Sequence, residues 1–230
     1  MPVLSTSQEQ LVLVRDGDPI LTYRVSGTSP RVNQRVGMEA ITRYVDSVKK
    51  GDHLVMLYDD PKLARSIEFH YVKNGIAKGE LCQYIIAKDD VESSESITRQ
   101  MEEDGIKTSA HLKAGRLEFR KIGDPSKDSR GFQHGASKIL EQLVEGVKSP
   151  IRMVLHVKYE FRTEDEISAH AEFERNIHHA FSNNFPGSML CNHFVGNSRM
   201  ELHRGWTRSM LDPHDCVFFV SSSRNTLSML

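Results

Sequence analysis

The chain has 230 residues, of which 38% are hydrophobic and 27% are charged. This length and these proportions are typical of one globular α/β domain. The 30 basic and 31 acidic side chains are interspersed, which excludes a strongly basic surface for a nucleic-acid backbone. No apolar run approaches the roughly 20 residues that span a bilayer, so we expect no direct contact with nucleic acid or membrane.

The first residues predict a β-rich start to the chain. Two β-prone runs flank an Asp-Gly-Asp-Pro turn sequence, which is typical of a hairpin over Gln10–Val25. A polar stretch, Ser26–Gln34, predicts a linker that leads to a short amphipathic helix over Met38–Lys49. Because an isolated hairpin is marginal in water, we expect this one to dock on the main domain or on a partner chain.

From residue 52 onward, short apolar runs alternate with longer amphipathic ones. This alternation predicts βαβ units, and the nearly continuous apolar character of the short runs indicates strands that helices cover on both faces. The expected strands are His53–Tyr58, Leu81–Ala87, Leu117–Ile122, Ile151–Val157, Ser188–Phe194 and Asp215–Ser221. The expected helices are Pro61–Lys78, Val91–Asp104, Gln133–Lys148, Asp165–Asn183 and Arg199–Leu211.

The expected fold class is therefore α/β, with a mainly parallel central sheet between two layers of helices and an N-terminal β-hairpin extension. We divide the chain into a hairpin and linker over residues 1–36, the α/β domain over residues 37–221, and a flexible tail over residues 222–230.

Three cysteines, Cys82, Cys191 and Cys216, lie in predicted strands and form no Cys-x-x-Cys pair. An odd number of such cysteines indicates reduced thiols in the core rather than a disulfide framework. The N-terminal sequence also lacks the basic and apolar regions of a secretory signal. We therefore expect a cytoplasmic protein.

The turn after the first parallel strand is where phosphate-binding loops lie in many α/β proteins. Here it runs from Tyr58 through Asp59, Asp60 and Pro61 to Lys62, without a glycine and with two carboxylates that repel phosphate. A Gly-x-Gly-x-x-Gly sequence does not occur elsewhere. The sequence predicts no P-loop nucleotide, no ATPase activity and no cofactor.

Several short motifs in order resemble the MEDS family, the sensory domains of methanogen and methylotroph regulators. They are Gly51–Tyr58, Asn74–Glu80, the aspartate pair after the second strand, the Glu172-Phe173-Glu174 helix, Leu190–Phe194 and the late His214. The resemblance covers about residues 37–221. It implies a fold similar to the RecA/KaiC-type ATPase core with the nucleotide loop lost, and a role in sensing small hydrocarbon derivatives without established catalysis. The sequence departs from the family pattern at His156–Glu160, where a glutamate-tryptophan signature is replaced.

Ligands of open α/β sheets bind at the carboxyl ends of the strands, so polar side chains there are candidate ligand contacts. Glu172 and Glu174 are two apart on a predicted helix and therefore cannot face one site together. His53 opens a strand and is expected to be a capping or hydrogen-bonded residue. The candidate ligand-binding residues are Tyr58, Asp59, Asp89, Tyr159, Glu172 and His193.

Two further patterns carry alternative chemistry. His170, Glu174 and His178 follow each other at helical spacing and could ligate a metal, although such polar rows are common on exposed helix faces. Cys191 and His193 alternate on one strand and share a face, as a nucleophile and its base would. A hydrolase would also need an orienting carboxylate and an oxyanion hole, which the sequence does not signal, so the pattern favours a buried thiol beside a hydrogen-bonded histidine.

The leading hypothesis is a non-catalytic sensory domain that binds a small organic ligand or a partner regulatory protein at the carboxyl ends of the strands. The first alternative is a cryptic hydrolase or metalloenzyme that uses Cys191 and His193. The second is an architectural module of a RecA-like assembly, in which the hairpin mediates homo-oligomerisation.

Overall fold

The computed structural model describes residues 9–14, 20–25, 31–36, 38–88, 92–145, 150–156, 168–172, 174–175, 186–194 and 216–220. Nine strands lie in these ranges: β1 (Glu9–Val14), β2 (Ile20–Val25), β3 (Arg31–Val36), β4 (His53–Tyr58), β5 (Leu81–Ala87), β6 (Leu117–Ile122), β7 (Ile151–His156), β8 (Gly187–Phe194) and β9 (Cys216–Val220). They form one sheet in the order β3-β2-β1-β9-β4-β8-β7-β5-β6. From β9 to β6 every neighbouring pair is parallel.

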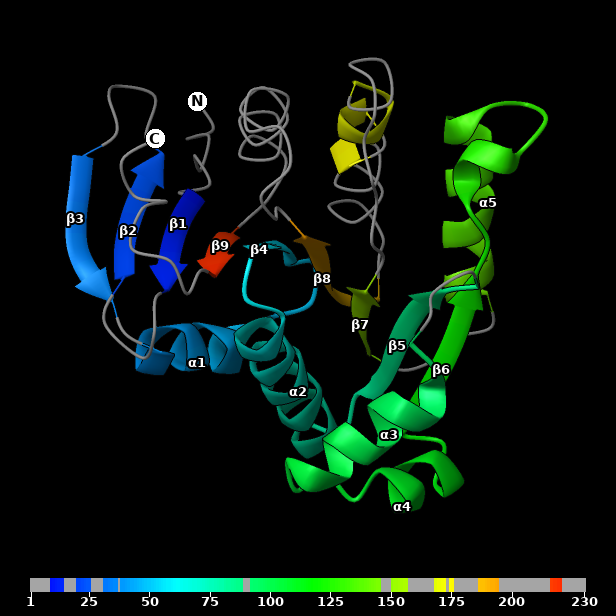
Figure 1. Cartoon of the computed structure of the whole chain (residues 1–230), viewed down its shortest axis with the longest axis horizontal. Coiled ribbons are helices and arrows are strands. Elements are labelled where there is room, and N and C mark those ends of the chain that lie inside the picture. Colours follow the sequence, from blue (N-terminus) through cyan, green and yellow to red (C-terminus); the bar gives the residue numbers. More distant parts are fainter. Residues whose placement is uncertain are drawn as a thin grey trace, which may run out of the picture.

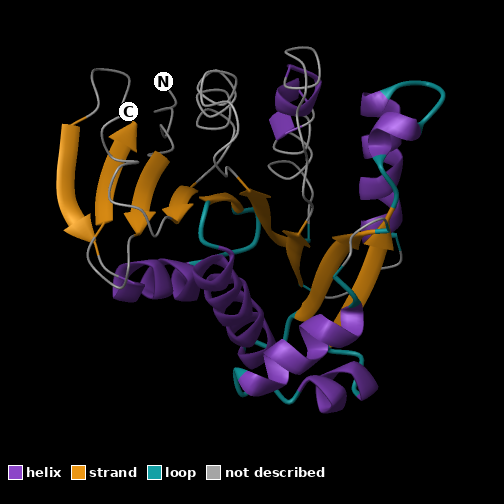
Figure 2. Cartoon of the chain, viewed as in Figure 1, coloured by secondary structure: helices purple, strands orange, loops and turns teal. Residues whose placement is uncertain are grey.

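Helices cover both faces of this sheet. They are α1 (Met38–Ser47), α2 (Pro61–Ala77), α3 (Ser94–Glu103), α4 (Thr108–Lys113) and α5 (Phe132–Val144), with a 3₁₀ turn at Pro125–Lys127 and helical residues at 168–172 and 174–175. In Figure 1, α1 to α4 lie on one side of the sheet, and α5 and the helical residues 168–172 and 174–175 lie on the other. Figure 2 shows the resulting three layers. The predicted three-layer fold with a mainly parallel sheet is confirmed.

The six predicted parallel strands all form, and their bounds differ from the expected ones by at most one residue. Two predictions need correction or extension. The stretch Ser26–Gln34 is not only a linker, because Arg31–Val36 forms β3, an edge strand antiparallel to β2. Edge strands tolerate polar side chains, which is why the apolar pattern missed it. The six-residue helix α4 was also not predicted. The predicted helix over Arg199–Leu211 and the tail over 222–230 lie outside the described residues.

The first two strands pair with each other in antiparallel register, and β1 also pairs in parallel with β9. The chain's first strands thereby continue the same sheet as the parallel strands. The turn at residues 15–19 that would join β1 to β2 lies outside the described residues, so the hairpin and the domain boundary at residue 36 stay predictions.

Alternation along β4 separates the two faces of the sheet. All six of its residues are buried. Leu54, Met56 and Tyr58 belong to the core cluster that includes residues of α1 and α2. His53 points to the opposite face, where it contacts Cys191 of β8. Both faces of the central strands are therefore covered, and their side chains are shielded from water, as the apolar runs predicted.

The start of α2 is capped by its own chain. Asp60 Oδ1 accepts hydrogen bonds from the backbone N–H groups of Lys62 and Leu63, each at 3.0 Å, and Pro61 occupies the first turn. This is the expected N-cap arrangement. Two N–H groups at the first strand-to-helix turn are consequently engaged by a carboxylate.

A buried arginine fixes the end of α2 to β7. Arg152 is 1% exposed, and its guanidinium donates to the Glu80 carboxylate, to Asn74 Oδ1 at 3.0 Å and to the Tyr71 carbonyl at 3.3 Å. It also lies 4.6 Å from the centre of the Tyr71 ring. Gly75 makes this approach possible, because a Cβ there would lie 2.6 Å from Arg152 Cδ and 2.7 Å from the Cys82 sulfur.

We expect Gly75→Ala to lower the free energy of unfolding by about 1–2 kcal/mol. Overpacking a core costs about 1–3 kcal/mol, and alanine recovers up to about 1 kcal/mol of helix propensity, so the steric effect wins. Urea denaturation followed by circular dichroism measures the difference. Gly123→Ala is the control, since nothing lies within 4 Å of its added Cβ. A Gly75→Ala protein as stable as wild type would show that the Arg152 side chain moves aside without a cost in stability.

Candidate functional site

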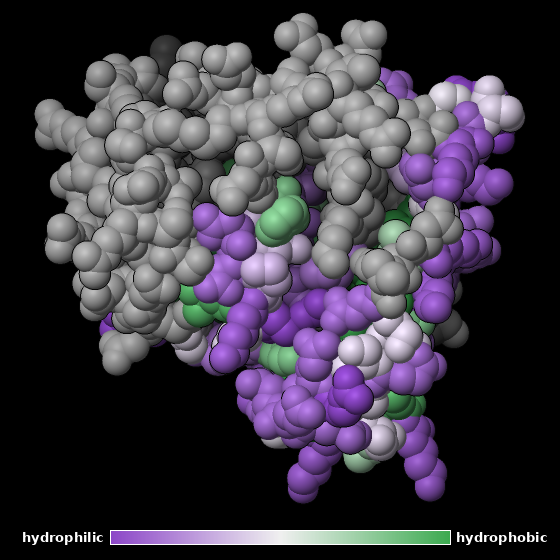
Figure 3. Space-filling view, viewed as in Figure 1, coloured by the Kyte–Doolittle hydropathy of each residue, from purple (hydrophilic) through white to green (hydrophobic). Residues whose placement is uncertain are grey.

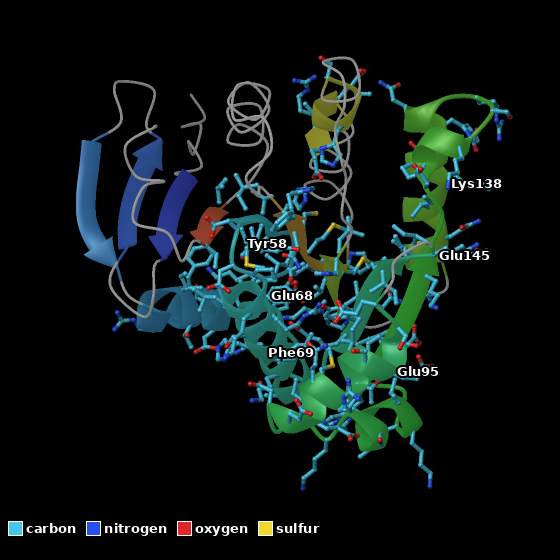
Figure 4. All side chains as sticks on the ribbon, in the orientation of Figure 1. Tyr58, Glu68, Phe69, Glu95, Lys138 and Glu145 are labelled. Atoms are coloured by element: carbon cyan, nitrogen blue, oxygen red, sulfur yellow. The ribbon has the colours of Figure 1, made fainter. Side chains whose placement is uncertain are left out.

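A buried carboxylate lies between α2 and the sheet. Glu68, labelled in Figure 4, is 0% exposed although it carries a charge. It lies in the second turn of α2, which follows the carboxyl end of β4. A charged group so deeply buried requires hydrogen bonds and opposite charge around it.

Both oxygens of Glu68 accept several hydrogen bonds. Oε1 accepts from His156 Nδ1 at 2.9 Å and from Asn192 Nδ2 at 2.8 Å. Oε2 accepts from the Tyr84 hydroxyl and from Arg65 Nη1, the latter at 3.2 Å. These donors come from the end of β7, from β8, from β5 and from α2 itself. One side chain therefore ties a helix to three strands.

The arrangement continues outward through Arg65. Its guanidinium also donates to the Tyr84 hydroxyl and to the Glu92 carboxylate, and Glu92 Oε1 accepts from Gln100 Nε2 at 2.9 Å. The side chains of Arg65 and Glu92 are 13% and 18% exposed, so they form the solvent-facing end. We call this set the Glu68 network: Arg65, Glu68, Tyr84, Glu92, His156 and Asn192.

The network changes the acidity of its members. Burial alone would raise the pKa of Glu68, but the charge and hydrogen bond of His156, together with Arg65 and Tyr84, outweigh burial and lower that pKa. Burial, followed by the negative charge of Glu68, raises the pKa of Tyr84 well above its usual value. Glu68 is therefore held as a carboxylate and Tyr84 as a phenol, which makes the tyrosine a donor.

Two buried polar atoms at this network have no hydrogen-bond partner among the described residues. They are His156 Nε2 and Asn192 Oδ1, on residues that pair across β7 and β8. The nearest charged group recorded for His156 Nε2 is Glu92 Oε2 at 3.9 Å, which is too far for a hydrogen bond.

A second buried polar group occupies the opposite face of the sheet. It consists of His53 from β4, Cys191 and His193 from β8, and His170 and Glu174 from the helical residues 168–172 and 174–175. Burial, followed by the negative charge of Glu174, raises the pKa of the Cys191 thiol well above its usual value. The contact recorded for this thiol is His53 Nε2 at 3.2 Å.

The structure separates the predicted ligand-binding residues. Tyr58 is buried on the α2 face, where its ring packs on Phe194 at 5.6 Å between centroids. His193 is buried on the opposite face, and Asp59 is half-buried. Glu172 is exposed whereas its neighbour Glu174 is fully buried, the opposite orientations that their spacing predicts. Asp89, Tyr159 and His178 lie outside the described residues.

The members of the Glu68 network were not ligand candidates in the sequence, although His156 begins the segment that departs from the family pattern. The available signal was the position of Glu68 in α2, four residues after Ala64 and four before Val72, both buried. A charged residue in the apolar stripe of a helix indicates a buried partner. The partners themselves come from distant strands and leave no local pattern.

The fold and the network define an α/β domain with a buried polar centre near the carboxyl ends of its parallel strands. The model of the MEDS family, described as methanogen/methylotroph, DcmR sensory domain, matches residues 52–200. This match covers well over half of the chain, and the protein belongs to the MEDS family. The resemblance seen in the sequence is thereby confirmed.

Among solved structures, the chain is similar to a KaiC-like protein from the hyperthermophilic archaeon Pyrococcus horikoshii OT3. The identity is 10%, the match covers 68% of each chain, and the TM-score is 0.46. No curated protein matches the sequence.

Among the described helices, none has both the length and the apolar character needed to cross a membrane. Figure 3 shows a mainly hydrophilic surface over α3 and α4 in this view.

We expect Glu68→Gln to lower the free energy of unfolding at pH 7 by about 3 kcal/mol, the lower end for breaking a buried pair. Because the folded-state pKa of Glu68 is lowered, its contribution is present above the unfolded pKa of about 4.3 and is lost as pH falls through the folded value. The gap between wild type and variant should therefore narrow between about pH 5 and pH 3.

Chemical denaturation at a series of pH values measures this gap. Glu172→Gln is the control, because the side chain is exposed, and its effect should stay within about 0.5 kcal/mol. A gap between wild type and Glu68→Gln that stays constant down to pH 3 would contradict a charged Glu68 in the folded state.

Proposed function

We propose that this protein is a non-catalytic sensory domain that binds a small organic molecule at the Glu68 network. The ligand class is a low-molecular-weight hydrogen-bond donor, a short-chain alcohol or amine. Membership of a sensory family supports the general role. The observation that carries the site is the pair of buried atoms without hydrogen bonds, His156 Nε2 and Asn192 Oδ1, beside a fully buried carboxylate.

Hydrogen-bond directions around Glu68 define the ligand chemistry. A carboxylate only accepts, so His156 donates to Glu68 through Nδ1, which leaves Nε2 as the ring atom available to a ligand. Asn192 likewise donates through Nδ2, which leaves Oδ1 as an acceptor. Asn192 Oδ1 and the Glu92 carboxylate, which lies 3.9 Å from His156 Nε2, both accept hydrogen bonds. A hydroxyl or ammonium group supplies the missing donors.

The position of the network supports sensing. Glu68 contacts residues of α2, β5, β7 and β8, and Arg65 extends the contacts to Glu92 immediately before α3. A ligand that alters the hydrogen bonds of His156 and Asn192 acts on elements that all share one carboxylate. Such a shared contact gives ligand binding a direct effect on the relative positions of a helix and three strands.

The hydrolase alternative has less support. Cys191 is 0% exposed, and a nucleophilic cysteine needs access to substrate. The thiol contacts His53 Nε2 at 3.2 Å. The architectural alternative requires β1 and β2 to pair with another chain. It has less support because β1 already pairs with β9 of the same chain.

The test is a titration of the isotope-labelled full chain with methylamine, ethanol and acetate, followed by the NMR signals of the histidine rings. We expect methylamine or ethanol to shift the His156 signals, because each donates hydrogen bonds. Acetate, which has no donor at pH 7, should leave them unchanged. His156→Gln should weaken binding about two- to tenfold, the effect of one lost hydrogen bond.

Glu172→Gln provides the matched control and should bind as wild type does, since its side chain lies on the surface of another helix. A response to acetate alone, or no response of His156 to either donor, would overturn the proposed ligand class.

A further inference from the structure

Five side chains that commonly bind metals meet on the sheet face opposite Glu68. They are His53, His170, Glu174, Cys191 and His193, and each is at most 3% exposed. Two strands and one helix contribute them, so residues more than a hundred positions apart in the chain converge. Their ligand atoms form two overlapping sets, each with atoms within 4.8 Å of one another, and Glu174 belongs to both.

The helix and the strand each prepare part of this arrangement. His170 and Glu174 are four residues apart, so both point from one side of the helix toward the sheet. His193 and Cys191 alternate on β8 and share the facing side. The rings of His170 and His193 meet edge to face with centroids 4.9 Å apart. Both imidazoles thereby direct Nε2 at the same carboxylate.

The distances fit ligands around a shared ion better than direct hydrogen bonds. Glu174 Oε1 lies 3.4 Å from His193 Nε2 and 3.6 Å from His170 Nε2. N–H···O hydrogen bonds have about 2.7–3.2 Å between heavy atoms. Around tetrahedral zinc, with metal–ligand bonds of about 2.0–2.2 Å, neighbouring ligand atoms are about 3.3–3.6 Å apart.

We propose that His170, Glu174 and His193 bind one divalent transition-metal ion of the zinc class. Two imidazoles and one carboxylate suit this ion, whereas magnesium and calcium prefer sites built from oxygen alone. A divalent cation also offsets the cost of burying the Glu174 carboxylate in the protein interior. Three protein ligands leave a coordination position for a small molecule, which is the pattern of an exchangeable rather than a purely structural zinc site.

His53 and Cys191 complete the surroundings of the site. His53 Nε2 lies 3.6 Å from Glu174 Oε2, the oxygen that faces away from His170 and His193. The same nitrogen contacts Cys191 Sγ at 3.2 Å. His53 thus lies beside the proposed ligand set, where second-sphere partners of metal ligands are found. The metal site lies on the face opposite the Glu68 network and does not depend on whether a ligand binds there.

The test uses the purified full chain after treatment with a chelator and dialysis. Zinc binding is measured by competition with a chromophoric chelator, and the retained metal by mass spectrometry. We expect one zinc ion per chain. His170→Ala and Glu174→Gln should each weaken binding at least about 100-fold, at or above the effect of losing an outer-shell partner. Glu172→Gln, on the same helix but exposed, should bind as wild type does.

Cobalt substitution reports the ligands directly and guards against loss of fold. The cobalt-loaded wild type should show the visible bands of a nitrogen- and oxygen-ligated ion and no thiolate charge-transfer band, and Cys191→Ser should leave the spectrum unchanged. A thiolate band would overturn the assigned ligand set. Wild type that takes up no stoichiometric zinc or cobalt would overturn the site, and the five residues would then form a metal-free hydrogen-bond and ion-pair cluster.

Discussion

A strand in the middle of this sheet has helices on both sides, so every polar side chain on it must find its partner inside the protein. The strand β8 carries Ser188, Asn192 and His193 under this constraint. Ser188 meets the Tyr71 hydroxyl at 2.7 Å, and Asn192 donates to Glu68, while His193 lies near Glu174 on the other face. An unpartnered polar group in such a place costs about 1–3 kcal/mol. Much of the molecule is arranged to supply these partners.

The two glutamates meet this constraint in different ways. Glu68 is surrounded by donors within hydrogen-bond distance, and Arg65 supplies opposite charge. Glu174 is surrounded by imidazole nitrogens at 3.4–3.6 Å, which is closer to the spacing of a coordination sphere. One side of the sheet thus has a compact carboxylate centre with its hydrogen-bond donors in place, and the other has a looser group of potential metal ligands. The difference in spacing suits an organic donor on the first side and a cation on the second.

The apolar runs predicted the parallel strands well because a strand buried on both faces has a strong sequence signal. The edge strand Arg31–Val36 has no such signal, since one of its edges needs no partner and its side chains are largely polar. Strand order could not be predicted, because it depends on which strand each helix returns to. That order places Asn192 beside His156. The hydrogen-bond partners of Glu68 cannot be predicted without knowing the strand order. The His170 and Glu174 pair was visible as a helical row, but only the packed structure shows that the row faces the sheet.

Asn192 and His193 are consecutive in the chain and serve opposite faces of the sheet. Because side chains alternate at every residue, deleting or inserting one residue within β8 would reverse which of them meets Glu68 and which meets Glu174. A change of two residues would keep the faces but move both groups along the strand by about 7 Å. The length of this segment is therefore constrained from both sides at once. Alignments of related chains should show substitutions within β8 but no gaps, with length variation displaced into the connections at its ends.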